Sequence, residues 1–379
     1  MPKQYISTNN AGAAHKSDIY SVAISKPYTI TASGDGYLKF WSNNVTETDV
    51  VKENVKEQFV HKTGLHHVAV FEDIVETTKI AIVATVSFSG EIFFFVVNSL
   101  DGSIEPLEVD LGTKSKDAYW AIQWSKDEEG QNHKFAATQA TGATKIWTFT
   151  IESINKITFS LHGTIAAQTK TFATALDLSS SNNLLATGFQ NGDVVLTQTE
   201  TSKPVYTFHN FGLKGSAQSS STIRSVKFSP LGTLLAIASD SGSYGTITLY
   251  DTVYGENVGS FTIPSHSSQV PIGAFAHDGW VFEIDFNETG EFLASAGYDG
   301  RIRVWNITTR EREATLALSP TDFDDEDIAA EDENASSSAI GVKFIKKGTR
   351  GGAGGDNNDG LVVISLDRGI RWFREAGGI

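Results

Sequence analysis

The chain has 379 residues and no cysteine, and its 30 Lys and Arg stand against 45 Asp and Glu, a formal net charge of −15. The lack of cysteine excludes disulfide bonds, cysteine-ligated zinc or iron–sulfur centres and a cysteine nucleophile. So acidic a chain lacks the attraction on which nucleic-acid binding usually depends, and the longest apolar run, IFFFVV at 92–97, is too short to span a bilayer. We therefore expect neither a direct nucleic-acid partner nor a membrane partner.

After a lone β-prone run at Tyr5–Ser7, the chain repeats one unit of short strands. In the first unit, the runs IYSVAI and TITAS precede the turn Asp35-Gly36 and the run YLKFW, which ends at Trp41. Asp-Gly between β-prone runs predicts a hairpin, because both residues tolerate positive φ. Corresponding turns, each followed five residues later by an aromatic residue or Thr197, lie at Ser89-Gly90, Thr141-Gly142, Asn191-Gly192, Tyr244-Gly245, Asp299-Gly300 and Asp367-Arg368.

Seven such units follow one another at spacings of about 50–55 residues, and the last spacing is 68 residues. A weaker outer strand, such as PVYTFH, accompanies the units, and a repeat of four short strands is the signature of a β-propeller. The seventh unit ends after its third strand, so we expect Tyr5–Ser7 to pair there as the fourth strand and close the ring. The sequence thus predicts an all-β fold, a single seven-bladed β-propeller domain over residues 1–379.

Tryptophan, histidine and aspartate recur at fixed places in these units. Three tryptophans end third strands, and in the first and sixth units an Asp of the turn is accompanied by an upstream His. An Asp–His–hydroxyl–Trp relay is the structural cement of WD-repeat blades, so these side chains are expected to be buried and hydrogen-bonded rather than catalytic. The residues concerned are His15, Asp35, Trp41, Trp147, His277, Asp299 and Trp305.

Two segments stand outside the repeat. Residues 319–338 contain eight acidic residues and no basic one, which predicts a solvated, disordered loop between the sixth and seventh units. The glycine-rich tract at 348–360 falls between the first two strands of the seventh unit. It lacks the Lys-Ser/Thr pair of a phosphate-binding loop and no helix follows it, so we interpret it as a flexible loop.

The densest histidine cluster is His61, His66 and His67. Adjacent residues of a strand point to opposite faces, so His66 and His67 are poorly placed to bind one metal ion. The chain contains neither HExxH nor G-x-S-x-G. We therefore expect no catalytic residue, no metal and no cofactor.

A surface pattern is more informative. In a propeller, the residues just before and at the start of each first strand lie on one flat face, together with the residue just before each turn Asp. Aromatic residues are frequent at these positions, and a contiguous exposed aromatic patch normally marks a protein-binding site. Some of these rings can instead line the central channel, and Trp120 can be a core residue. The predicted protein-binding residues are Asp18, Tyr20, His66, Phe88, Trp120, Phe172, Gln190, Arg224, Trp280, Phe282 and Tyr298.

Several segments carry a more specific resemblance. The chain resembles the fungal WD-repeat subunit of the superkiller (Ski) complex, over essentially its whole length. The segments that carry the resemblance are SGDGYLKFW (33–41), HKTGLHHV (61–68), STIRSVKFSPLGTLLAIASDSGSYGTITLY (221–250), SAGYDGRIRVW (295–305) and the terminal RGIRWFREAGGI (368–379).

This resemblance implies a non-catalytic scaffold that binds a tetratricopeptide-repeat subunit and an RNA helicase, in an assembly that feeds mRNA to the cytoplasmic exosome for 3′-to-5′ decay. It also implies a nuclear role in meiotic recombination, through a topoisomerase-like break-forming protein. Both partners are expected to offer a short Gln-Arg-containing peptide that ends in a hydrophobic residue. The aromatic face suits the hydrophobic end, and Asp18 is a candidate partner for the Arg.

Two alternatives stay open on the sequence alone. The first is a substrate receptor of a ubiquitin ligase, a common use of WD-repeat propellers, although the strand ends read WSNN, WTFT and WNIT rather than Trp-Asp-x-Arg. The second is direct RNA binding through stacking on Trp120, Trp280 and Arg224, against which the acidic charge argues.

Overall fold

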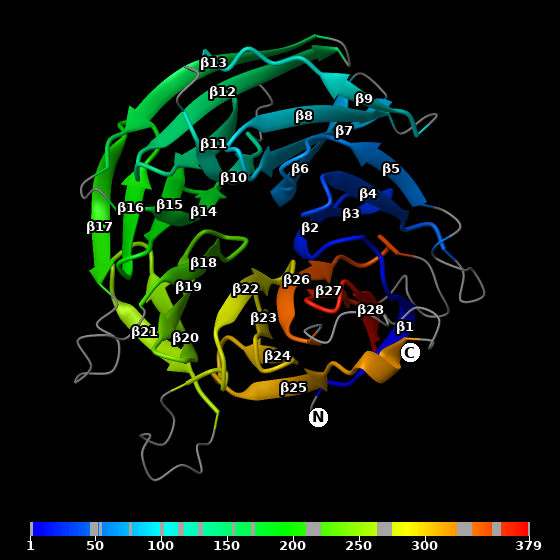
Figure 1. Cartoon of the computed structure of the whole chain (residues 1–379). Coiled ribbons are helices and arrows are strands. Elements are labelled where there is room, and N and C mark those ends of the chain that lie inside the picture. The colour runs from blue at the N-terminus through cyan, green and yellow to red at the C-terminus, as the bar shows by residue number, and fades with distance from the viewer. Residues whose placement is uncertain are drawn as a thin grey trace.

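The computed structural model describes residues 3–45, 52, 55–75, 78–98, 102–112, 117–127, 132–153, 156–167, 171–209, 221–263, 275–323, 336–350 and 358–377. Their strands form seven four-stranded antiparallel sheets, and these are arranged as blades around a central axis (Figure 1). Each blade packs against its two neighbours and so buries faces that a single small sheet would leave exposed to solvent. The predicted seven-bladed propeller is therefore confirmed.

The strands run outward from the axis in chain order within blades 1 to 6. Blade 1 contains β2 (Ile19–Ile24), β3 (Tyr28–Ser33), β4 (Tyr37–Ser42) and β5 (Val55–Phe59). Blade 2 contains β6 (Leu65–Val75), β7 (Thr78–Ser87), β8 (Ile92–Asn98) and β9 (Ile104–Leu107). Blade 3 contains β10 (Tyr119–Ser125), β11 (His133–Gln139), β12 (Thr144–Ser153) and β13 (Lys156–Ile165).

Blade 4 contains β14 (Ala173–Ser179), β15 (Leu184–Phe189), β16 (Asp193–Gln198) and β17 (Lys203–His209). Blade 5 contains β18 (Ile223–Phe228), β19 (Leu234–Ser241), β20 (Tyr244–Asp251) and β21 (Asn257–Phe261). Blade 6 contains β22 (Val281–Phe286), β23 (Phe292–Gly297), β24 (Arg301–Asn306) and β25 (Arg312–Ala317), followed by a 3-10 turn, η2 (Pro320–Asp322). Blade 7 contains β26 (Ala339–Ile345), β27 (Gly360–Ser365) and β28 (Ile370–Glu375), with β1 (Tyr5–Ala11) as its outer strand.

The N-terminal strand closes the ring as predicted, and it is longer than Tyr5–Ser7. β1 pairs antiparallel with β28, with Tyr5 opposite Glu375 and Ala11 opposite Ile370. Both chain ends therefore lie at blade 7 (Figure 1). The pairing covers an edge of β28 that would otherwise expose unpaired backbone groups.

The Asp–His–hydroxyl–Trp relay is complete in blades 1 and 6. In blade 1, His15 Nδ1 lies 3.1 Å from Asp35 Oδ2, and its Nε2 lies 2.8 Å from Thr31 Oγ1, which also accepts a bond of 3.0 Å from Trp41 Nε1. Burial opposes ionisation of Asp35, but hydrogen bonds from His15 and from the backbone outweigh it and lower the pKa of Asp35 to about 2. The relay thus fixes the loop before the first strand to the third strand.

Blade 6 repeats this geometry with a serine hydroxyl. His277 Nδ1 lies 2.9 Å from Asp299 Oδ1, and Ser295 Oγ lies 2.8 Å from His277 Nε2 and 2.9 Å from Trp305 Nε1. Trp147 in blade 3 is equally buried but has no relay: Ala137 stands at the hydroxyl position, and the indole donates to the carbonyl of Leu111 at 3.0 Å.

One detail of the predicted repeat was wrong. In blade 5 the hairpin turn is Gly242-Ser243, because β20 already begins at Tyr244 and Gly245 lies opposite Asp240 within the ladder. In blade 7, Phe373 lies at the repeat position of Trp41 and Trp305 but is only partly buried, whereas the adjacent Trp372 is fully buried with its ring 5.9 Å from that of Trp41. Trp372 faces blade 1, whereas the half-buried Phe373 packs toward blade 6.

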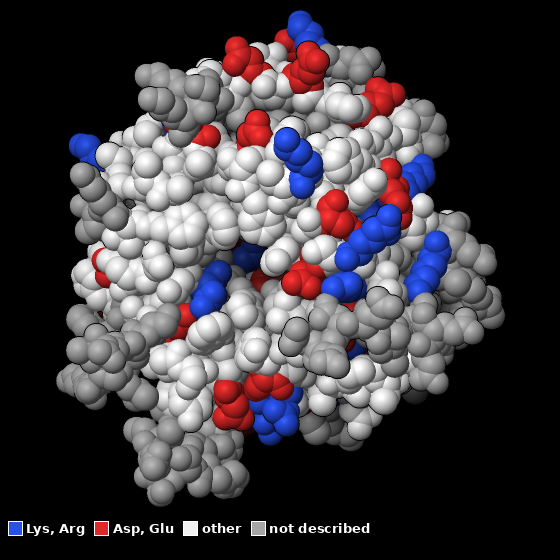
Figure 2. Space-filling model, viewed as in Figure 1, with Lys and Arg blue, Asp and Glu red and all other residues white. Residues whose placement is uncertain are grey.

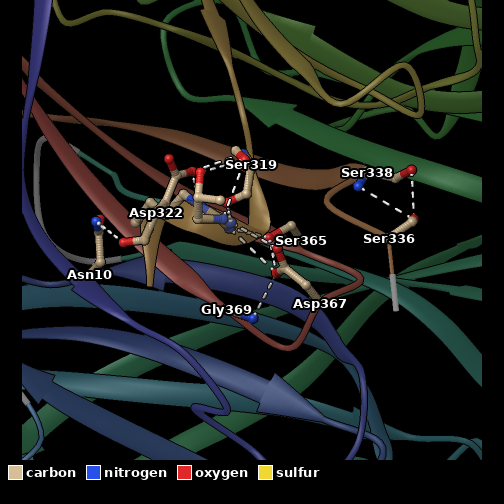
Figure 3. Close-up of polar contacts among 10 residues, drawn as sticks. Asn10, Ser319, Asp322, Ser336, Ser338, Ser365, Asp367 and Gly369 are labelled. Atoms are coloured by element: carbon tan, nitrogen blue, oxygen red, sulfur yellow. Dashed lines mark hydrogen bonds and ion pairs between the residues drawn. The ribbon is translucent and has the colours of Figure 1, made fainter. Parts of the chain in front are cut away.

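The acidic segment begins with η2 and leads into β26, and its residues 324–335 lie outside the described part of the chain. Arg371, fully buried in β28, donates to Asp322 of η2, to Asp367 and to Ser365 at 2.7, 2.7 and 2.6 Å. Figure 3 shows Asp322, Ser365 and Asp367 close together, with Asn10 of β1 donating to the carbonyl of Asp322. The first residues of the acidic segment are therefore hydrogen-bonded to β28 and β1, the strands that close the ring.

The glycine-rich tract is likewise anchored at its first residues, and 351–357 lie outside the described residues. Arg350 is buried and donates to Asn9 of β1 at 3.0 Å and to the carbonyl of Ser42 at 3.2 Å. Its guanidinium lies 4.4 Å from the ring of Trp372. Arg350 therefore links blade 7 to blade 1 at the joint of the ring.

Candidate functional site

A β-bulge near the start of every first strand builds the site. In each of β2, β6, β10, β14, β18, β22 and β26 the register shifts and one extra residue is left unpaired. A bulge turns a side chain out of the regular alternation and so re-aims it. The seven re-aimed residues all line one central cavity, and they are Tyr20, His66, Trp120, Thr174, Arg224, Phe282 and Ile340.

A repeated backbone hydrogen bond adds a second row of side chains. In six blades, the N–H of the residue before the turn donates to the carbonyl of a residue just before the first strand, for example Phe88 to Gly64 at 3.1 Å and Tyr298 to Trp280 at 2.8 Å; in blade 5 the donor is Asp240 of β19, to Thr222 at 3.0 Å. This bond holds the two loops of each blade at the same level. We call the ring of residues at this level the channel rim; it comprises the seven bulged residues together with Phe88, Phe172, Gln190, Trp280, Tyr298 and Leu366.

The cavity inside the rim has a volume of about 900 Å³ and is lined by all seven first strands. Figure 2 shows it as a hollow at the centre of the ring, with charged side chains in and beside it and mostly uncharged surface around it. Its wall also includes Lys343 and Glu283, which form an ion pair, and Lys227, which pairs with Asp177 behind the wall. The cavity is therefore aromatic at its mouth and charged, but internally paired, along its wall.

One arc of the rim, across blades 1 to 4, is a continuous chain of rings. Phe88 contacts Tyr20 and His66 with ring centroids 5.1 and 5.0 Å apart. His66 stacks on Trp120 at 4.1 Å, and Trp120 meets Phe172 edge to face at 5.0 Å. Tyr20 and Phe88 are 41% and 44% exposed, so this arc offers apolar surface to a ligand.

The opposite arc, across blades 5 and 6, surrounds the guanidinium of Arg224. Arg224 donates to the buried Asp240 at 2.8 and 3.0 Å, and its guanidinium lies 4.7 Å from the ring of Trp280 and 5.5 Å from that of Phe282. Tyr298 is half exposed and lies 6.1 Å from Trp280. Because Asp240 already pairs with Arg224, this arc presents a flat aromatic–guanidinium surface.

Nine of the eleven residues proposed from the sequence line the cavity together. The other two lie beside it: Tyr298 packs on Trp280 and Phe282, and Asp18 is near Arg368, with Oδ1 and Nε 3.9 Å apart. Sequence reasoning missed Thr174, Ile340 and Leu366, which are not aromatic. Thr174 and Ile340 could have been found from their position in the repeat, because they occupy the bulge that is equivalent to that of Tyr20.

The histidine cluster does not form a metal centre. His61 lies 2.8 Å from the hydroxyl of Thr63, whereas His66 stacks on Trp120. Within the described residues, no three His, Cys, Asp or Glu side chains are grouped so that they could hold a metal ion. The same part of the chain contains no helix long and apolar enough to cross a membrane.

Comparisons with known proteins agree with this architecture. Residues 9–42 and 269–306 match the WD domain, G-beta repeat, and residues 176–272 match the Anaphase-promoting complex subunit 4 WD40 domain. The chain is 42% identical to antiviral protein SKI8 of Saccharomyces cerevisiae over the full length of both proteins. It is also 29% identical to meiotic recombination protein rec14 of Schizosaccharomyces pombe, over 68% of this chain and 74% of that protein.

A shorter similarity, 31% identity over 27% of this chain and 15% of that protein, relates it to WD repeat-containing protein 1 of Xenopus tropicalis. The full-length similarity, together with the WD-domain matches and the seven blades, agrees with the resemblance carried by the sequence segments. The chain therefore belongs to the fungal WD-repeat family of antiviral protein SKI8.

Proposed function

We propose that this protein is a non-catalytic scaffold subunit of the superkiller complex and that its channel rim docks a short peptide of the tetratricopeptide-repeat subunit. Docking helps the RNA helicase of the assembly to feed mRNA to the cytoplasmic exosome for 3′-to-5′ decay. The observation that carries the proposal is the convergence of nine rim residues, proposed from separate repeats, on one cavity. The full-length similarity to SKI8 supports membership of the assembly.

The chemistry of the rim suits a peptide with one hydrophobic end. The arc formed by Tyr20, Phe88 and Trp120 can bury an apolar side chain, and aromatic residues in such pockets supply most of the binding energy of an interface. Asp18, at the edge of this arc, is the proposed partner of an Arg in the peptide, in competition with Arg368.

The similarity to rec14, a meiotic recombination protein, supports a second role of the same rim. We propose that it docks a nuclear, topoisomerase-like break-forming protein through a peptide of the same kind. The two partners then exclude each other from one rim, because they use the same rings.

The proposal is tested by affinity purification of the tagged protein from fungal cell extract, comparing wild type with Trp280→Ala. We expect wild type to recover a tetratricopeptide-repeat protein and an RNA helicase, and Trp280→Ala to recover much less of both. The matched control is Tyr254→Ala, which removes an aromatic residue that is 74% exposed in the β20–β21 turn, at the opposite end of its blade.

Equal recovery by wild type and Trp280→Ala would refute docking at the rim. Asp18→Lys tests the Arg partner separately, because unchanged recovery would show that Asp18 does not pair with the peptide while leaving docking at the rim intact.

A filter-binding assay with single-stranded RNA at low salt tests the alternative of direct RNA binding. Tight binding by the isolated chain would favour direct RNA recognition instead.

A further inference from the structure

His66 is the most enclosed polar side chain of the channel rim. It is 7% exposed, and it lies between the rings of Trp120 and Phe88, at 4.1 and 5.0 Å. Burial lowers the pKa of His66 to about 4, so the ring is neutral at physiological pH. As the bulged residue of β6, it is aimed at the central cavity.

The hydrogen bonds of this neutral ring are incomplete. Within the described residues Nε2 has no hydrogen-bond partner and is closed off from solvent. The backbone carbonyl of Ser87 faces the ring and favours an N–H on it, and because Nε2 has no partner we assign the N–H of the neutral ring to Nδ1. A neutral imidazole that donates through Nδ1 carries a lone pair on Nε2. His66 therefore holds a buried hydrogen-bond acceptor without a donor, an arrangement that is unfavourable and rare in folded proteins.

Other polar side chains of the rim do have partners inside the protein. Arg224 is paired with Asp240, Trp280 Nε1 donates to the carbonyl of Gly242 at 2.9 Å, and Thr174 donates to the carbonyl of Ile223 at 2.6 Å. The unpaired nitrogen of His66 is thus a local exception rather than a general feature of the bulge position. Such an exception in a binding cavity points to a partner that arrives with the ligand.

Phe88 is the more exposed of the two rings that contact His66. It is 44% exposed and lies in the turn after β7, where its ring contacts are with Tyr20, His66 and Trp120. Trp120, on the other side of His66, is held between His66 and Phe172. A rotation of Phe88 therefore disturbs less packing than a movement of Trp120 does.

We infer that His66 determines peptide specificity at the rim: when Phe88 turns aside, Nε2 of His66 accepts a hydrogen bond from an amide N–H of the docked peptide. This inference rests on the proposed docking function and names one polar contact within it. The apolar side chain of the same peptide then fills the space between Tyr20 and Trp120.

The test uses a fluorescein-labelled synthetic peptide that carries Gln-Arg and ends in a hydrophobic residue, with fluorescence anisotropy as the readout. His66→Phe keeps a ring against Trp120 but removes the acceptor, and we expect an affinity loss of about tenfold. His66→Gln restores an acceptor at a similar reach and should bind within about threefold of wild type. His66→Phe should not lower the urea midpoint, because the carbonyl of Ser87 keeps its bond from Gly90 N–H at 2.8 Å.

A peptide series in which each amide is replaced in turn by an ester identifies the donor. One replacement should weaken binding to wild type about tenfold and leave binding to His66→Phe unchanged. If His66→Phe binds like wild type while Trp120→Ala does not bind, the inference about His66 is overturned and docking at the rim stands. If wild type itself does not bind the peptide, the proposed function fails and this inference fails with it.

Discussion

Thr31→Val tests the relay that holds the blades together. Thr31 is fully buried, and its hydroxyl lies between the ring of His15 and the indole of Trp41, at 2.8 and 3.0 Å. Valine has the same shape as threonine but cannot form hydrogen bonds. The substitution therefore removes the bridging hydroxyl without opening a cavity.

The expected cost follows from the groups that are left without a partner. The Trp41 N–H and the Nε2 of His15 both become buried and unpaired, because Thr31 is the partner that the structure shows for each. Each unpaired buried group costs about 1–3 kcal/mol, which gives a loss of about 2–6 kcal/mol. This is a large share of the about 5–15 kcal/mol by which a typical domain is stable.

The assay is urea denaturation followed by far-ultraviolet circular dichroism, with Thr31→Ser as the control. Thr31→Ser keeps the hydroxyl and copies Ser295, which bridges the same groups in blade 6. We expect the midpoint to fall strongly for Thr31→Val and only slightly for Thr31→Ser. Equal midpoints for wild type and Thr31→Val would refute the argument that the hydroxyl completes the relay.

Two further predictions concern the closure of the ring by β1 and the stability of the protein at acidic pH. Removal of residues 1–10 should sharply lower the melting temperature, because β28 loses its partner strand and Arg350 loses Asn9; an unchanged temperature by scanning calorimetry would refute closure by β1. The pKa of His66 falls from 6.5 when unfolded to about 4 when folded, so the unfolded chain binds a proton that the folded chain excludes. Stability is therefore lost as pH falls from 6.5 to 4, by about 3 kcal/mol from this residue, and His66→Phe should remove that part of the loss. Parallel urea midpoints for wild type and His66→Phe between pH 7 and pH 4 would contradict the burial of a neutral ring.

Much of the fold was readable because the repeat is carried by local signals. Asp35-Gly36 and Asp299-Gly300 fix hairpin turns, and Trp41 and Trp305 end the strands that follow, so the spacing alone counted the blades. Prediction from the sequence failed where two turn signals compete. In blade 5, Gly242 and Gly245 both fit a turn, and only the ladder opposite Asp240 decides between them.

The positions of most site residues could be predicted from the sequence, but the contacts among them could not. Tyr20, Trp120 and Phe282 could be proposed because aromatic residues at these places are conspicuous, whereas Ile340 occupies the same bulge and was passed over. Pairing inside the rim is a tertiary property. Nothing in the sequence shows that Arg224 is satisfied by Asp240 while Nε2 of His66 is left without a donor.

The most direct test of the account is the affinity of the labelled Gln-Arg peptide for single alanine variants, measured by fluorescence anisotropy. Trp120→Ala at the rim should weaken binding by about 30-fold or more, since buried tryptophans at interfaces contribute at least about 2 kcal/mol, whereas Tyr254→Ala outside the rim should bind like wild type. Equal affinities for all three proteins would show that the rings around the central cavity are not where the partner docks.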